Sequence, residues 1–566
     1  MQLRERQLQA LPDVTYDVLI IGGGINGAVA AAALSGRGLK VGLIDQRDFA
    51  GFTSQQSSNL AWGGIKYLET FEFALVRQLC KSRNELMRHY PSSVREIRFL
   101  TTIEKGFRHH PFSLWSGAWL YWLMGNGFTR VPRLLSTSRI KRDEPVIQTG
   151  NSLGGMEYSD AYLYDNDARF VFTFIRTALD QGCSAVNYIK SLGSDRVDDL
   201  WHTQAQDVMT GRELTIRSHV LINATGPFVD AMNTRSGIAT KHRHLFSKGI
   251  HLIVEGVTPS SRVLAFFADD GRLFFVIPMG SKTCIGTTDT RVDSPLTEVT
   301  EADRDFVLSQ INRRLQLERP LGADDIIAER CGVRPLAVVG REGDQEDFLN
   351  LSRKHAIDVD PDRAHISIFG GKLTDCLNVG EGLCAIVVDL GLQLPRPGQK
   401  WYGEPSASVR ANFMQWAQRI RLDDFTPAES EEGLSTRLWR RYGEQALALL
   451  EAIEQDAAQA EPILAGTPFL RCEIELMAER EMIVTLEDFL RRRSDLALVT
   501  RYGDLRRAAG LMDVCTILFG PEQAEQKFND YFCAETKTDS GTTALHRASR
   551  PLARSLLESQ DHGPQA

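Results

Sequence analysis

The apolar and polar positions near the start of the chain form a pattern that predicts three consecutive elements. The run Tyr16-Asp-Val-Leu-Ile-Ile21 is short and mostly apolar, as expected for a buried β-strand. Small residues follow from 28 to 34, and a second apolar run over 39–44 ends at Asp45. We therefore expect a strand, a helix and a second strand, in the order of a β-α-β unit.

The turn between the first predicted strand and the helix contains Gly22, Gly24 and Gly27. This G-x-G-x-x-G spacing is typical of dinucleotide-binding turns. The first glycine permits a tight turn, the second lets the backbone approach a pyrophosphate, and the third lets helix and strand pack closely. The motif alone is weak evidence, but here a strand precedes it and a helix follows, so we predict a dinucleotide site.

Polar groups complete the predicted dinucleotide site. Ile25 and Asn26 begin the helix, whose N-terminal N–H groups favour a phosphate charge. Asp45 and Gln46 follow the second strand, where a carboxylate can accept hydrogen bonds from the adenosine ribose. The pattern by itself does not separate FAD from NAD.

The character of the chain changes near residue 405, where strand patterns give way to charged, helical segments. Residues 437–454 predict one helix, and Thr485-x-x-Asp488 predicts a capping box before another. Residues 536–566 are polar with little periodicity, so we expect a disordered tail.

Residues 109–125 are unusually rich in aromatic side chains. Trp115, Trp119 and Trp122 recur at helical spacing and form one stripe, with basic residues on both sides of the segment. Aromatic and basic residues favour the headgroup region of a membrane. A monotopic membrane contact is one interpretation, and a buried helix or a subunit interface is the other.

The composition is that of an ordinary soluble enzyme, with 43% hydrophobic and 24% charged residues. A formal net charge of −8 argues against nucleic acid as the main partner. The nine cysteines form no C-x-x-C pair, so we expect neither a metal centre nor a disulfide framework.

Two features of the sequence bear on where the protein is located. The first residues are charged and lack an apolar segment, so we expect no secretory signal. No run of about 18 uncharged apolar residues occurs, so we expect no membrane-spanning helix. The expected location is the cytoplasm.

Short motifs continue along most of the chain. In order they are Ile21-Gly-Gly-Gly-Ile-Asn-Gly27, Asp48-Phe-Ala, Gly63-Gly-Ile-Lys-Tyr-Leu-Glu69, Tyr158-Ser-Asp, Asp167-Ala-Arg169, Asn223-Ala-Thr-Gly-Pro227, Lys248-Gly-Ile-His251, Ile285-Gly-Thr-Thr-Asp289, Gly332-Val-Arg-Pro-Leu336, Phe369-Gly-Gly-Lys-Leu-Thr374 and Ala478-Glu-Arg-Glu-Met-Ile-Val-Thr-Leu-Glu-Asp-Phe-Leu. With these motifs, residues 14–535 resemble the FAD-dependent, quinone-linked glycerol-3-phosphate dehydrogenases.

The resemblance implies an α/β fold, a two-domain flavoprotein like glutathione reductase and D-amino-acid oxidase with a Rossmann-like FAD domain. The oxidoreductase region would span 14–400, followed by a helical domain over 401–535. The FAD domain would be discontinuous, near 14–95, 155–240 and 330–400. A substrate domain built on an antiparallel sheet would take 96–154 and 241–330.

The resemblance also implies site residues. Those expected around FAD are Gly22, Gly24, Ile25, Asn26, Gly27, Asp45, Gln46, Thr53, Ser54, Ser57, Ser58, Leu60, Thr225, Gly226, Gly370, Gly371, Leu373 and Thr374. The expected catalytic residues are Arg334, His251 and Lys372, and the expected substrate ligands are Lys66, Tyr67, Arg353 and Lys354. His251 is the candidate general base, because an imidazole has a suitable pKa, and a structural histidine near the flavin is the alternative.

Two positions depart from the family pattern. Trp62 replaces a usual histidine, and Lys66 replaces an arginine expected at the substrate phosphate. Lysine keeps the charge but lacks the planar, two-pronged donor geometry of arginine. Upstream, Gln55 and Gln56 stand where the family often carries Ser-Arg.

The function implied by the resemblance is FAD-dependent oxidation of sn-glycerol 3-phosphate to dihydroxyacetone phosphate. A membrane quinone would accept the electrons, at the cytoplasmic face of the inner membrane, and a homodimer is left open. A peroxide-forming oxidase, a paralogue acting on another hydroxy acid or polyol phosphate, and a flavin-binding interaction protein without turnover are the alternatives.

Overall fold

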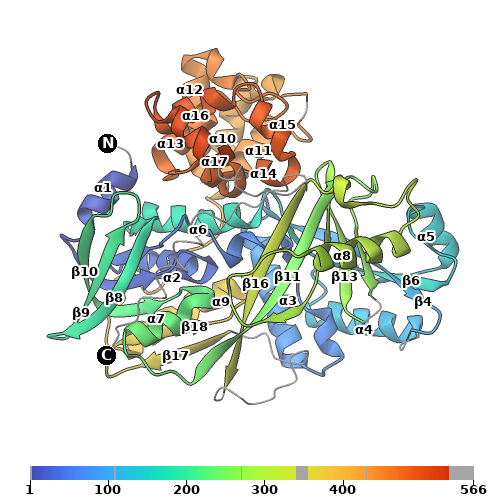
Figure 1. Ribbon diagram of the computed structural model, residues 1–566, viewed down its shortest axis with the longest axis horizontal. Helices are drawn as coiled ribbons and strands as arrows, with labels where there is room; N and C mark the ends of the chain where they lie inside the picture. The colour runs from blue at the N-terminus through green and yellow to red at the C-terminus, as the bar shows by residue number, and fades with distance from the viewer. Residues whose placement is uncertain (1–2, 108–109, 269–270, 340–354, 429, 534–566) are drawn as a thin grey trace.

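The computed structural model describes residues 3–107, 110–268, 271–339, 355–428 and 430–533 (Figure 1). The predicted substrate ligands Arg353 and Lys354 lie outside the described residues, as does the predicted tail 536–566.

The first sheet has a parallel centre. Its eight described strands include a path in the order β17 (Ala356–Asp360), β18 (His365–Phe369), β10 (Glu213–Asn223), β1 (Thr15–Ile21), β2 (Val41–Ile44) and β7 (Ser184–Val186). From β18 to β7 the neighbours run parallel, and β9 (Leu200–Asp207) and β8 (Ile189–Val197) extend antiparallel from β10. The carboxyl ends of β1, β10 and β18 therefore meet at one edge of the sheet.

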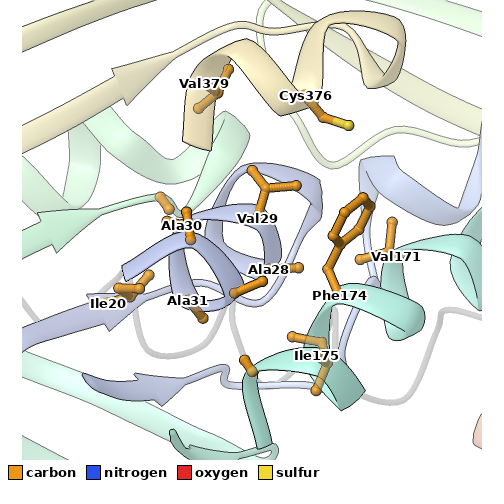
Figure 2. Packing of buried hydrophobic residues seen from close by; sticks show 14 of the residues in the cluster. Ile20, Ala28, Val29, Ala30, Ala31, Val171, Phe174, Ile175, Cys376 and Val379 are labelled. Atoms are coloured by element: carbon orange, nitrogen blue, oxygen red, sulfur yellow. The ribbon is translucent and has the colours of Figure 1, made fainter. Parts of the chain in front are cut away.

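Helix α2 (Ile25–Gly36) packs tightly beside this sheet. Figure 2 shows α2 between α6 (Asp167–Asp180) and α9 (Cys376–Asp389), with Ala28 facing Phe174 and Val29 facing Cys376. The alanines of α2 are fully buried, because short side chains let neighbouring helices approach closely. Two further helices of this part are α1 (Leu3–Ala10) and α7 (Val229–Arg235).

The second sheet is mostly antiparallel. Its ten described strands include a path in the order β15 (Thr290–Val292), β11 (His242–Glu255), β14 (Lys282–Gly286), β13 (Leu273–Met279), β12 (Val263–Phe267), β4 (Val94–Glu104), β6 (Ser152–Leu163) and β3 (Leu60–Ala61). In addition, β16 (Ala328–Val339) pairs with β11, and β5 (Arg133–Leu135) pairs with β6. The predicted domain borders near 155 and 330 fall inside β6 and β16, both of which belong to this sheet.

Helices surround the second sheet and connect it to the first. They are α3 (Phe73–His89), α4 (Pro111–Met124), α5 (Thr137–Asp143) and α8 (Glu301–Arg314), with the short turns η1 (Thr53–Gln55), η2 (Ile65–Leu68), η3 (Gly226–Phe228), η4 (Ala323–Asp325) and η6 (Leu373–Asp375). Figure 1 shows α4 along the lower edge of the molecule, on the side away from the C-terminal helices.

The C-terminal helices have a hydrophobic core of their own. They are α10 (Ala407–Arg419), α11 (Leu434–Tyr442), α12 (Ala446–Gln455), α13 (Arg471–Arg480), α14 (Leu496–Val499), α15 (Tyr502–Arg507), α16 (Leu511–Phe519) and α17 (Ala524–Cys533), joined by η7 (Leu422–Phe425), η8 (Gly443–Gln445), η9 (Ala457–Ala460) and the π-helix η10 (Asp488–Arg493). The single helix predicted over 437–454 is wrong, because Gly443 ends α11 with a φ of 55°.

Candidate active site

The glycine turn after β1 has no room for side chains. Gly22 has a φ of +108°, and a Cβ there would lie 2.5 Å from the carbonyl oxygen of Ala224. A Cβ on Gly27 would lie 1.7 Å from the carbonyl oxygen of Gly22. The turn and helix can therefore approach each other only with glycine at both positions, which leaves the backbone open to a ligand.

The N-terminus of α2 is covered by the segment that follows β2. The Ile25 N–H donates to Ser54 Oγ at 3.0 Å, and a Cβ on Gly24 would lie 3.2 Å from the same oxygen. Thr53 Oγ1 donates to the carbonyl oxygen of Val333 at 2.9 Å, so the same segment also contacts β16. Thr53 and Ser54 thus stand between the helix N-terminus and the second sheet.

Asp45 lies at the carboxyl end of β2, beside the glycine turn. Its carboxylate accepts hydrogen bonds from the N–H groups of Gly23 at 2.6 Å and Arg47 at 2.8 Å. Burial raises the pKa of Asp45 to about 6, and these two hydrogen bonds oppose the rise. Gln46 follows directly and is half-buried.

The remaining predicted cofactor residues gather along the same sheet edge. Thr225 Oγ1 donates to Asn223 Oδ1 at 2.7 Å just after β10, and Gly226 follows with a φ of 59°. Asn26 Nδ2 donates to the carbonyl oxygen of Gly370 at 2.9 Å, which joins α2 to the turn after β18. Gly371, Leu373 and Thr374 continue that turn, and Ser57, Ser58 and Leu60 lie on the segment entering β3.

These groups fit a flavin dinucleotide. A helix N-terminus and a glycine turn suit a pyrophosphate, and the half-buried carboxylate at the strand end suits a ribose. The turn at 370–374 comes from a distant part of the chain and begins next to the start of α2. One extended ligand could therefore contact all these elements, as FAD requires.

Arg334 and His251 lie on one face of the second sheet. In the antiparallel pairing of β11 with β16, Ser247 is opposite Arg334 and His251 is opposite Arg330. The Arg334 guanidinium donates to Thr287 Oγ1 at 3.0 Å and lies 3.8 Å from Asp289. A Cβ on Gly249 would lie 2.4 Å from the Arg334 Nη2, so the absence of a side chain there makes room for the guanidinium.

His251 is almost completely buried, with 3% of the residue exposed. Neither ring nitrogen has a hydrogen-bond partner among the residues that the structure describes. Burial, together with the positive charges of Arg330 and Arg334, lowers the pKa of His251 well below 6.5. The imidazole is therefore neutral near pH 7, the form that can accept a proton.

Lys372 and Tyr67 form a second polar centre. Lys372 Nζ donates to Tyr67 Oη at 2.8 Å and lies 4.1 Å from the centre of its ring. Lys66 precedes Tyr67 in η2 and is exposed. Trp62, one of the two departures from the family pattern, packs its ring 6.0 Å from that of Tyr67.

Aromatic rings connect the two centres. Trp62 packs against Phe275 with ring centres 6.4 Å apart, and Phe275 is paired with Gly286. Gly286 is in turn paired with His251, and a Cβ on Gly286 would lie 2.7 Å from the imidazole. The structure thus brings Tyr67 and Lys372 to the neighbourhood of His251 and Arg334.

Arg330 is a site residue that our reading of the sequence missed. It is 1% exposed, donates to the Ser57 carbonyl oxygen, and lies 3.3 Å from Asn59 Oδ1. A signal was present, because Arg330 and Arg334 stand four residues apart in one strand and so point to the same face.

Fold and site together define an oxidoreductase that uses a flavin dinucleotide. Residues 17–353 match the family model described as FAD dependent oxidoreductase, and residues 394–525 match that of the C-terminal domain of alpha-glycerophosphate oxidase. The aerobic glycerol-3-phosphate dehydrogenase of Bacillus subtilis is 31% identical over 530 residues, which cover 88% of this chain and 92% of that protein. The chain belongs to the family of FAD-dependent glycerol-3-phosphate dehydrogenases.

Solved structures agree on the fold. The glycerol-3-phosphate dehydrogenase of Bacillus halodurans, complexed with FAD, has a TM-score of 0.71 at 24% identity, over 94% of this chain and 97% of that one. The L-alpha-glycerophosphate oxidase of Mycoplasma pneumoniae, with FAD bound, has a TM-score of 0.52 at 17% identity, over 69% and 98%. The predicted family, fold class and FAD cofactor are confirmed.

No helix in the described parts of the chain has the length and hydropathy needed to cross a membrane. The individual roles predicted for the site residues, the quinone and the membrane contact stay predictions.

Proposed function

We propose that the protein oxidises sn-glycerol 3-phosphate to dihydroxyacetone phosphate and passes the electrons to a membrane quinone. The observation that carries this proposal is the half-buried Arg334, held by Thr287 on the sheet face beside the neutral His251. Lys372 and Tyr67 add a second polar centre close by. The relatives, which are glycerol-3-phosphate dehydrogenases, support the choice of substrate.

Oxidation of a secondary alcohol removes a hydride from carbon and a proton from oxygen. Bound FAD supplies the hydride acceptor. Residues of the chain then have two tasks, to hold the substrate phosphate and to take the hydroxyl proton. Arg334 suits the first task, because a guanidinium can form two parallel hydrogen bonds to a phosphate. Lys66, Lys372 and Tyr67 are the further substrate ligands in this proposal.

His251 is the proposed proton acceptor. Its lowered pKa keeps the ring neutral, and neither nitrogen is engaged by a described residue, so the nitrogen without a hydrogen is available to accept a proton. A general base has to reach the substrate oxygen within about 3 Å. In the alternative role, the buried imidazole only shapes the wall of the site.

The proposed route to quinone uses the surface around α4. Its exposed apolar side chains are Phe112, Leu120 and Leu123, and Phe128, Val131 and Leu134 follow nearby. Arg130 is largely exposed on the same connection, with 64% of its side chain accessible. Apolar side chains with cations at their edge suit a membrane surface, so we propose a monotopic contact here.

The decisive test is anaerobic mixing of the purified protein with sn-glycerol 3-phosphate while the visible absorption of the flavin is followed. Rapid bleaching supports the proposed substrate. If dithionite bleaches the flavin but sn-glycerol 3-phosphate does not, the proposal is wrong, and Trp62 and Lys66 become the reason to test other polyol phosphates and hydroxy acids.

An oxidase is the second candidate, favoured by the match of residues 394–525 to the C-terminal domain of alpha-glycerophosphate oxidase. An oxidase would transfer the electrons to oxygen and form hydrogen peroxide. Peroxide release in air, compared with reduction of a water-soluble quinone under nitrogen, distinguishes the two acceptors.

A further inference from the structure

Three consecutive arginines of the helical domain enter the oxidoreductase region. Arg491, Arg492 and Arg493 end the π-helix η10, and each is at most 4% exposed. We refer to these three residues as the arginine triplet. A π-helix is rare and occurs often at functional sites, so its partners are informative.

The triplet contacts the segment over 48–59, which follows β2. Arg493 Nη1 and Nη2 form two hydrogen bonds to the Asp48 carboxylate, at 2.8 and 2.9 Å. Arg492 Nε donates to the same carboxylate at 2.8 Å, and its Nη1 lies 3.2 Å from Gln55 Oε1. Arg491 donates to the backbone carbonyl of Gln55.

The segment over 48–59 has little regular structure of its own. Apart from η1, its backbone takes irregular conformations, and Ala50 and Asn59 have φ values of 61° and 58°. Left-handed conformations are unfavourable for residues that have a Cβ atom, and they persist only where surrounding contacts impose them. The segment therefore depends on partners from outside to keep one shape.

The same segment forms a wall of the flavin site. Ser54 accepts from the N–H of Ile25 at the start of α2, and Thr53 donates to the carbonyl oxygen of Val333, next to Arg334. A Cβ on Gly332 would lie 2.9 Å from Gln56, so β16 and the segment are in close contact. A displacement of Gln55 would therefore also displace Ser54 and Thr53, which contact the start of α2 and β16.

The charges of the triplet are balanced within the protein. Asp48 faces Arg492 and Arg493, while Asp488 and Glu487 face Arg492 and Glu481 faces Arg493. Arg491 lies 4.0 Å from Asp167, whose Oδ2 accepts from the Ser57 N–H. The cations are thus engaged by carboxylates of the protein itself.

We propose that the arginine triplet consists of positioning residues for the flavin-binding segment over 48–59, so that the helical domain completes the FAD site. None of the three arginines has to touch FAD. The triplet acts through Asp48 and Gln55 on Ser54 and Thr53, and through them on the start of α2 and on β16. This inference rests on the FAD dependence of the family and not on the proposed substrate.

The test uses the full-length protein and measures FAD affinity directly. Arg491→Met removes the donor to the Gln55 carbonyl oxygen while leaving the Asp48 pair intact. Arg437→Met is the matched control, because Arg437 is equally buried and pairs with Glu473 inside the helical domain, away from the segment. The apoproteins are titrated with FAD by flavin fluorescence, and thermal unfolding of each apoprotein is recorded.

For Arg491→Met we expect FAD to bind at least tenfold more weakly and the visible absorption band of the bound flavin to shift. Arg437→Met is expected to unfold at lower temperature but to bind FAD within about twofold of the wild type. Wild-type affinity in Arg491→Met, or equal losses in both variants, would overturn the proposal.

A second variant guards against failure of the first to fold. Arg492→Lys keeps a positive charge near Asp48, but a lysine ammonium lacks the planar guanidinium that lets Arg492 bond to Asp48 and Gln55 at the same time. We expect a folded protein with weakened FAD binding, and wild-type affinity would again contradict the inference. Neither outcome depends on turnover, so an error in the proposed substrate would leave this result unchanged.

Discussion

At the scale of single residues, the site depends on how burial and neighbouring charges tune each group. Arg334 is partly accessible, with 29% of its side chain exposed. Arg330, four residues earlier in β16 and on the same face of the sheet, is buried. His251 lies opposite Arg330 and is kept neutral by burial and by both arginines. Asp45 shows the same principle with a carboxylate, since burial raises its pKa to about 6.

Replacing Arg334 tests its role in the reaction. We expect Arg334→Ala to lower kcat/KM by about 10²–10³-fold, because it removes two hydrogen bonds to the charged substrate phosphate, each worth about 1.5–3 kcal/mol. FAD should stay bound, because Arg334 bonds to Thr287 on the second sheet, whereas the predicted pyrophosphate cradle is the glycine turn after β1 in the first sheet. Steady-state kinetics and the flavin spectrum provide the measurement, with the exposed Arg506→Ala as control. Normal turnover of the variant would show that Arg334 has no role in the reaction.

The lowered pKa of His251 leads to a prediction on pH. A base is active in its neutral form, so activity should persist to lower pH than the pKa of about 6.5 of an exposed imidazole would allow. We expect His251→Gln to lower kcat by about 10²–10⁴-fold. A pH profile of kcat/KM and single-turnover bleaching measure both effects. If His251→Gln retains turnover within a few fold, the histidine has a structural role only.

Asp45 should make FAD binding dependent on pH. If the ionised carboxylate accepts hydrogen bonds from the ribose, FAD binds more tightly as pH rises through about 6 and then levels off. Asp45→Asn should abolish this change and weaken binding by about 10- to 100-fold, the usual loss of a hydrogen bond to a charged group. Titration of the apoproteins between pH 5 and 8 measures both, and identical curves would contradict the role.

At the scale of elements, α4 shows that an aromatic stripe and an exposed face differ. Trp115, Trp119 and Trp122 are half-buried and pack in a row, with neighbouring ring centres 6.0 and 5.4 Å apart. The most exposed apolar residues of the helix are instead Phe112 and Leu123, both 59% accessible. The tryptophans therefore support the helix, and the membrane contact we propose would use its other apolar residues.

A triple variant of α4 tests this contact. Replacing Phe112, Leu120 and Leu123 with Ser should release the protein from lipid vesicles that contain anionic lipid. Each lost insertion of a large apolar side chain costs about 1.5–3 kcal/mol, so binding should weaken by far more than tenfold. Cosedimentation measures the change, with Val388→Ser and Met512→Ser as exposed controls on α9 and α16. Equal binding by the triple variant and the controls would argue for a different occupant of this surface.

At the scale of the whole molecule, buried ion pairs join the helical domain to the rest. Arg169 of α6 pairs with Glu481 at 2.5 Å, and Arg440 of α11 pairs with Asp165 at 3.0 Å. Burial alone would raise the pKa of these carboxyls, but the arginines outweigh it and hold the pKa of Glu481 and Asp165 below their usual range. Breaking such a pair leaves an uncompensated buried charge, which is strongly destabilising.

These depressed pKa values predict acid sensitivity of the junction. A carboxyl with a lowered folded pKa stabilises the protein above its unfolded pKa of about 4, and this contribution is lost as pH falls further. Thermal unfolding temperatures should therefore fall steeply below pH 4, with release of FAD in the same range. Calorimetry and flavin fluorescence from pH 7 to 3 provide the measurement. A constant unfolding temperature down to pH 3 would show that the pairs contribute little.

Local sequence determined much of the fold. The strand-turn-helix at 16–36 and the acid at 45 follow from periodicity and glycine spacing, because each concerns residues that are neighbours in the chain. The break of the predicted helix at Gly443 was not visible in the periodicity, since apolar spacing continues on both sides of η8. The contact of Arg330 with the Ser57 carbonyl oxygen was likewise not predictable from local sequence, because it depends on the pairing of β16 with β11.

The class of cofactor site follows from local sequence, because a pyrophosphate cradle is made by one short stretch whose geometry its own glycines dictate. The surroundings of that cradle depend on tertiary packing. Asp48 and Arg492 lie 444 residues apart in the chain and meet in a buried ion pair. No periodicity or spacing encodes such a contact, since it arises from the packing of the helical domain against the oxidoreductase region.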